Sequence, residues 1–116
     1  MTQDEAHEKL EEFRQKIDLI DRQIVELLNS RTRVVEEIGR VKGEAQLPIY
    51  EPKREEMVFA NITASNQGPI TAAGLKRIFE RIIDEMRTIQ RLRMAARLSA
   101  VAEVGHVCRV LVTGHV

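Results

Sequence analysis

Two positively charged side chains fall within the apolar stripe of a helix predicted near the start of the chain. When that helix is projected at about 100° per residue, the stripe centres on the direction of Phe13 and Ile24. Arg31 points in the same direction, and Lys42 lies only about 20° from it. An unpaired charge is costly to bury, so each cation needs an ion-pair partner or an anionic ligand. Structural salt bridges, or stems whose charged ends reach water, are the alternative.

Two further features could complete a site for an anion. The segment LPIYEPKREEM, residues 47–57, places a lysine, an arginine and two glutamates directly after Pro52, which suits the first turn of a helix. Gln90 lies at the edge of the apolar stripe of a later helix, either as a solvated boundary residue or as a neutral donor to a developing negative oxygen. The sequence has no catalytic Ser/His/Asp or Cys/His arrangement, no metal-ligand spacing and no glycine-rich phosphate loop. An enzyme built on these residues would act by positioning and electrostatics, without nucleophile, metal or cofactor.

Three helices must position these residues. The first is predicted from about Asp4 to Glu44, because apolar residues recur there at steps of three and four. A second helix is predicted from Pro52 to about Ala64, and a third from Ala72 through at least Leu92, with Thr71 as its candidate N-cap. The segment after Gly105, HVCRVLVTGHV, is typical of a strand or of an unanchored end. The predicted fold class is all-α.

The first predicted helix is too long for this chain to cover alone. Its roughly 41 residues extend about 60 Å, whereas a compact domain of this size is about 35 Å across. The remaining stretches offer too little apolar surface to cover it. A second copy of the chain is the simplest partner, so we expect a homodimer.

The composition favours a soluble, cytoplasmic protein of one domain. The 116 residues include 18 basic and 18 acidic side chains, and this zero net charge argues against a nucleic-acid partner. The single cysteine, Cys108, indicates a reducing compartment. No apolar stretch approaches the ~20 residues that span a bilayer, which predicts no membrane insertion. The acidic start MTQDEAHEKLEEF is unlike a signal peptide.

Three stretches of the chain together resemble the all-helical class of chorismate mutases. They are LEEFRQKIDLIDRQIVELLNSRTRVVEEIGRVK (10–42), PIYEPKREE (48–56) and IFERIIDEMRTIQ (78–90), in the order and spacing of that family. The resemblance implies an intertwined homodimer of three-helix chains that converts chorismate to prephenate in phenylalanine and tyrosine biosynthesis, without a cofactor. We expect residues 1–92 to form this domain and residues 93–116 to be a C-terminal extension.

The resemblance also implies which cations bind the substrate. Arg14, reaching in from the partner chain, and Arg31 would bind substrate carboxylates. Arg54 corresponds to the third arginine of the site, on the second helix. Lys42 would bind a carboxylate and the ether oxygen of chorismate.

The remaining implied roles belong to polar residues on the second and third helices. Glu55 would accept a hydrogen bond from the substrate hydroxyl, and Glu51 would lie near that hydroxyl. Gln90 would donate to the ether oxygen. Met86 departs from the family pattern, because it stands where a small polar residue, often serine, is expected to contact a carboxylate.

Two other functions are compatible with the same residues. An isochorismate-pyruvate lyase on this scaffold would share Arg14, Arg31, Lys42 and Gln90, although the segment EPKREE favours the mutase. A non-catalytic helical dimerisation module would have no affinity for small dicarboxylates and would tolerate substitution of Arg31.

Overall fold

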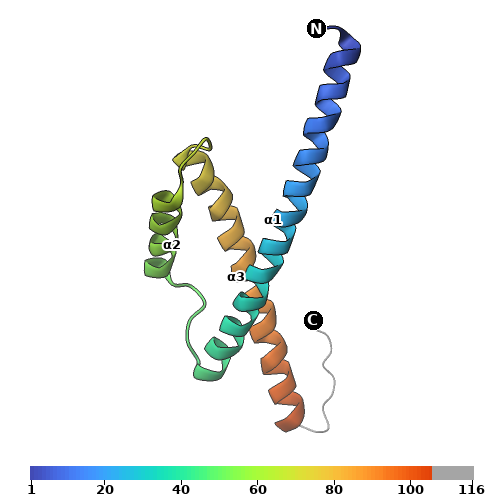
Figure 1. The fold of residues 1–116 in the computed structure, drawn as a ribbon. Helices are drawn as coiled ribbons and strands as arrows, with labels where there is room; N and C mark the ends of the chain where they lie inside the picture. The colour runs from blue at the N-terminus through green and yellow to red at the C-terminus, as the bar shows by residue number, and fades with distance from the viewer. Residues whose placement is uncertain (106–116) are drawn as a thin grey trace. The chain divides into compact units, whose positions relative to one another are not determined.

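The computed structural model describes residues 1–105. They form three α-helices with short connections, and this part of the chain contains no strand (Figure 1). Helix α1 spans Gln3–Ala45, α2 spans Pro52–Ser65 and α3 spans Ala72–Gly105. The predicted all-α class and the order of the three helices are confirmed. Helix α3 passes through position 92 without a break. The segment HVCRVLVTGHV lies outside the described residues.

The chain divides into an N-terminal unit, Met1–Arg33, and a second unit that begins at Val34. The N-terminal unit is the first part of α1, which starts with a reciprocal cap: Thr2 Oγ1 accepts from the Glu5 amide at 3.1 Å, and Glu5 Oε1 accepts from the Thr2 amide at 3.3 Å. No other element of this unit covers its large apolar side chains. Exposed fractions of 44–70% are found for Leu10, Phe13, Ile17, Ile20, Ile24 and Leu27.

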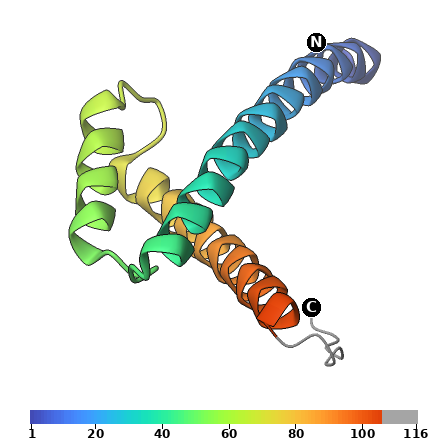
Figure 2. The same ribbon diagram turned by 90° about the horizontal axis from the view of Figure 1, so that it is seen from below.

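In the second unit, α2 lies antiparallel beside the first half of α3 (Figures 1 and 2). The apolar side chains buried there are Val35, Ile83 and Met86. An ion pair between Arg93 of α3 and Glu36 of α1 adds a contact at the surface. Nowhere in the described part of the chain is a helix both long and apolar enough to cross a membrane.

Helix α1 ends at Ala45, three residues after Lys42, in a tight reversal. Gln46 has a positive φ of 58°, and the amide of Leu47 donates to the carbonyl of Lys42 at 2.8 Å. This is the pattern of a Schellman motif, in which the residue with left-handed backbone angles is usually glycine. The reversal turns the following residues back toward the last turn of α1.

The connection between α2 and α3 is held by side chains that bond to the backbone. Asn66 donates through Nδ2 to the carbonyl of Ile70 at 2.9 Å and accepts from the amide of Gly68 at 2.9 Å. Thr71 Oγ1 accepts from the amide of Gly74 at 3.0 Å, three residues into α3. The prediction that Thr71 caps the third helix is therefore confirmed.

Replacing Thr71 by alanine should destabilise the second unit, because the amide of Gly74 loses its acceptor. We expect Thr71→Ala to lower the free energy of unfolding by about 0.5–2 kcal/mol, whereas Thr71→Ser should retain most of it. Urea unfolding of all three proteins at one protein concentration measures this difference. Equal midpoints for the alanine and serine variants would show that the hydroxyl does not stabilise α3.

Candidate active site

Lys42 is a charged side chain in the interior of the second unit, with an exposed fraction of 7%. Its ammonium group donates to the carbonyl of Ile49 at 3.1 Å and to Gln90 Oε1 at 3.2 Å. It also forms an ion pair with Glu51 at 2.6 Å. An ammonium has three N–H groups, so each of them has an acceptor. The burial predicted from the apolar stripe is observed, and the pair with Glu51 satisfies the charge without any ligand.

Local structure on both sides of Lys42 explains this arrangement. Lys42 stands in the last turn of α1, where a cation is favoured by the helix dipole. The reversal at Gln46 brings the carbonyl of Ile49 back to the ammonium. Glu51 occupies the N-cap position of α2, but its side chain makes no capping hydrogen bond. Its carboxylate, 49% exposed, is directed to Lys42 instead.

Gln90 is the second buried polar side chain, with an exposed fraction of 9%. Because an ammonium can only donate, the amide oxygen of Gln90 must face Lys42. Among the side chains that the structure describes, residues 1–96, the amide nitrogen of Gln90 has no hydrogen-bond acceptor. The alternative that Gln90 is a solvated boundary residue is therefore wrong. Its amide N–H groups remain able to donate to another partner.

Gly39 allows α1 to approach α3 closely beside Gln90. A Cβ atom at position 39 would lie 3.4 Å from Cα of Gln90 and 3.6 Å from its Cγ. A methyl group fits at these distances, but a branched side chain would not. The backbone of α1 thus sets the position of Gln90 relative to Lys42.

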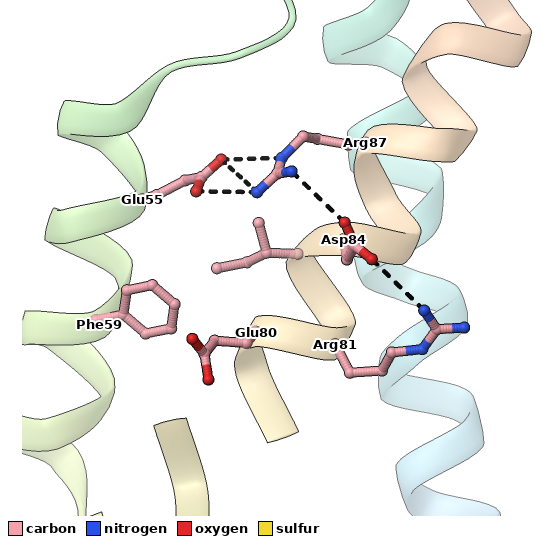
Figure 3. Close-up of a pocket in the computed structure, with 7 residues that line it drawn as sticks. Glu55, Phe59, Glu80, Arg81, Asp84 and Arg87 are labelled. Carbon is pink, nitrogen blue, oxygen red and sulfur yellow. Dashed lines mark hydrogen bonds and ion pairs between the residues drawn. The ribbon is translucent and has the colours of Figure 1, made fainter. Parts of the chain in front are cut away.

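Glu55, on the first turn of α2, forms a two-pronged ion pair with Arg87 of α3 (Figure 3). Nε of Arg87 donates to Oε2 and Nη2 donates to Oε1, both at 3.0 Å. Glu55 lies one helical turn after Glu51, and Arg87 lies three residues before Gln90. The pair therefore lies about one turn from the Lys42 cluster along both helices.

The Glu55–Arg87 pair also borders a cavity of about 430 Å³ between α2 and α3. Figure 3 shows Arg87 reaching across to Glu55 at one side of this cavity, with Phe59 and Glu80 further along. The residues that line it are Glu55, Phe59, Glu80, Arg81, Ile83, Asp84 and Arg87.

Arg87 was not among the residues predicted for the site, because the apolar stripe of the third helix does not include the arginines beside it. A signal was available, because Arg87 precedes Gln90 by three residues and so falls near the same helix face. Arg54, the neighbour of Glu55, is the arginine that the resemblance placed in the site. Arg54 is instead exposed and has no ion pair among the described residues.

Three further residues were predicted for the site, and they are Arg14, Arg31 and Met86. Arg14, exposed, and Arg31, half-buried, belong to the N-terminal unit. Met86 is buried in the apolar core, one turn before Gln90 on α3. The substrate-binding roles expected for these three residues stay predictions.

The profile of the type II chorismate mutases matches residues 13–91. The chain belongs to this family. Another member, the chorismate mutase of Methanocaldococcus jannaschii, is 30% identical over 86 residues, which cover 72% of this chain and 86% of that protein. A solved chorismate mutase structure from Thermus thermophilus (Form II) is 36% identical with a TM-score of 0.70, covering 72% of this chain and 94% of that one.

The family also includes longer, bifunctional proteins. The bifunctional chorismate mutase/prephenate dehydratase of Aquifex aeolicus is 34% identical over 103 residues. These residues cover 85% of this chain but only 28% of that protein. This chain thus spans less than a third of that bifunctional relative.

Substitutions at Gly39 test how closely α1 approaches Gln90. Gly39→Ala should be neutral or slightly stabilising, because the methyl group fits and alanine favours a helix. Gly39→Val should lower the free energy of unfolding by about 1–3 kcal/mol, because its branches overpack the contact. Chemical denaturation of the two variants and the parent checks this. A valine variant as stable as the alanine variant would contradict the close approach of α1 to Gln90.

Proposed function

We propose that this protein is a chorismate mutase, which rearranges chorismate to prephenate in the synthesis of phenylalanine and tyrosine. The observation that carries the proposal is the buried contact between Lys42 and Gln90, which brings a cation and an amide donor together. Membership of the type II chorismate mutase family supports the same reaction. The rearrangement is a one-step pericyclic shift, so it needs no covalent bond between protein and substrate.

The proposed site lowers the barrier in two ways. It holds the flexible substrate in a compact conformation with the reacting ends in contact. It also stabilises the negative charge that develops on the ether oxygen as the C–O bond breaks. We assign this second task to Lys42 and to the amide group of Gln90. Donors aimed at that oxygen accelerate the reaction because they bind the transition state more strongly than the substrate.

Lys42 must release one acceptor to bind the substrate. Of its three acceptors, Glu51 is the one that can be released most easily. Its side chain is half-exposed, so water can hydrate the carboxylate once it leaves Lys42. We propose that Glu51 turns away from Lys42 and lies near the substrate hydroxyl. Glu55 accepts a hydrogen bond from that hydroxyl.

The carboxylates of chorismate are bound by arginines in this proposal. Arg31 and Arg54 come from one chain and Arg14 from its partner, and the planar guanidinium suits bidentate pairing with a carboxylate. Met86 lines the site without a strong donor, so it offers an apolar contact where a small polar residue would bind a carboxylate.

The proposed site requires an intertwined homodimer in which α1 acts as one very long helix. The exposed apolar side chains of the N-terminal unit support a second copy as the cover for this surface. We assign the chorismate mutase domain to residues 1–92 and regard residues 93–116 as an extension. The single cysteine supports a cytoplasmic setting.

The activity is tested by following chorismate absorbance with the purified protein and identifying the product. We expect prephenate. Lys42→Met should reduce kcat/KM by about 10²–10³, the usual cost of losing a donor to a developing charge. Lys53→Met is the matched control, because Lys53 is an exposed lysine in the first turn of α2 and should leave the rate unchanged.

Other outcomes of this assay would point to other functions. Release of pyruvate from isochorismate without turnover of chorismate would assign the scaffold to a lyase. Inactivity toward both compounds, in a folded protein, would indicate a dimerisation module. Equal rates for Lys42→Met and the parent would remove the Lys42–Gln90 contact from the mechanism.

Arg14 and Arg31 should complement each other between chains. They are about 25 Å apart along one helix, too far to grip one small substrate from the same chain. A dimer of one Arg14→Ala chain and one Arg31→Ala chain would contain one doubly damaged site and one intact site. Random exchange in an equal mixture should therefore restore about a quarter of the parent activity, because half of the dimers regain one of two sites.

Sedimentation at micromolar concentration and mass spectrometry of differently tagged chains would verify the dimer and the exchange. Sustained inactivity after proven exchange would place the two arginines in separate roles. A folded monomer would contradict the shared site altogether.

A further inference from the structure

Glu55 and Arg87 form a contact between α2 and α3 that the proposed mechanism has not used. Both carboxylate oxygens of Glu55 accept from the guanidinium of Arg87, each at 3.0 Å. The two side chains are partly buried, with exposed fractions of 22% for Glu55 and 25% for Arg87. A bidentate pair fixes the plane of the carboxylate as well as its distance. The orientation of Glu55 therefore depends on Arg87.

Arg87 is itself held from two further directions. Its Cζ atom lies 5.6 Å from the centre of the Tyr50 ring, in the connection between α1 and α2. Its Nη1 atom lies 3.5 Å from Asp84 Oδ1, one turn earlier on α3 (Figure 3). A guanidinium that contacts a ring and a second carboxylate loses little further freedom when it binds Glu55. Lysine could not reproduce these contacts, because it carries a single point charge.

The pair leaves Glu55 able to accept another hydrogen bond. Each carboxylate oxygen has two lone pairs. Arg87 donates once to Oε1, through Nη2, whereas Oε2 accepts from Nε and also lies 3.0 Å from Nη2, so Oε1 keeps a lone pair for a further donor. Glu55 lies four residues after Glu51, the N-cap residue of α2, so the two carboxylates lie near the same end of this helix. The remaining acceptor capacity of Glu55 therefore lies about one helical turn from Glu51, the residue that pairs with Lys42.

We infer that Arg87 is a positioning residue for Glu55. Its guanidinium fixes the carboxylate in the orientation in which a remaining lone pair accepts from the ring hydroxyl of the substrate. This inference rests on the proposed function, which assigns that hydroxyl to Glu55. Arg87 acts through Glu55 and does not itself touch the substrate.

A double-mutant cycle on activity tests this inference. Arg87→Met in the parent should lower kcat/KM by about tenfold, within the range of couplings measured between contacting residues. The loss should come mainly from a higher KM, because a contact to the hydroxyl binds substrate and transition state alike. In a Glu55→Ala background, Arg87→Met should cause little further loss, since no carboxylate remains to be oriented.

Two further variants serve as controls. Arg87→Lys keeps the charge but loses the bidentate geometry, so its KM should lie between those of the parent and Arg87→Met. If Arg87→Met does not fold, the KM of Arg87→Lys tests the inference instead. Arg81→Met removes another arginine of the same helix. In the described part of the chain Arg81 pairs with Asp84 and Glu85, both on α3, so this variant should leave KM unchanged.

The outcomes separate this inference from the proposed function. An active parent in which Arg87→Met costs the same factor with and without Glu55 would overturn the positioning role alone. A lower kcat with an unchanged KM and a lower unfolding midpoint would also overturn it, because it indicates a structural contact. A parent that does not turn over chorismate would overturn the proposed function, and this inference with it.

Discussion

The ammonium group of Lys42 is the constraint on which most of the second unit depends. A buried cation is tolerated only when its hydrogen-bonding capacity is fully used, because its desolvation is otherwise uncompensated. Its three acceptors come from the turn after α1, from the N-terminus of α2 and from the middle of α3. One charge therefore connects the end of α1 with both other helices. The same requirement orients the amide of Gln90, because only its oxygen can face an ammonium.

The features that were predicted from the sequence depend on local information. Helix boundaries follow from apolar residues at steps of three and four, from Pro52 at a first helical position and from Thr71 as an N-cap. The predicted ends of α1 and α2 and the predicted start of α3 lie within one residue of the observed boundaries, whereas the end of α3 was predicted only as at or after Leu92 and is observed at Gly105. The burial of Lys42 also followed from the sequence, because a helical projection needs no knowledge of neighbouring elements.

The contacts of the site required information that a single sequence does not contain. Glu55 and Arg87 are 32 positions apart, and their pairing depends on how α2 lies beside α3. Arg54 and Glu55 are adjacent, but successive residues of a helix point about 100° apart. Only Glu55 meets α3, and Arg54 remains exposed. Gln90 stood at the edge of a stripe, so its burial depended on the close approach that Gly39 permits.

Glu51 occupies the N-cap position of α2 but caps nothing, because its carboxylate is bound to Lys42. The start of a helix attracts negative charge through its free N–H groups and its dipole. In the proposed mechanism Glu51 leaves Lys42 for the substrate hydroxyl, and its carboxylate then still lies at the positive end of its own helix. Occupancy of the site and fraying of α2 then become linked equilibria. The coupling is reciprocal. If an anion bound to Lys42 orders this helix end, an ordered helix end raises the affinity of Lys42 for that anion by the same factor.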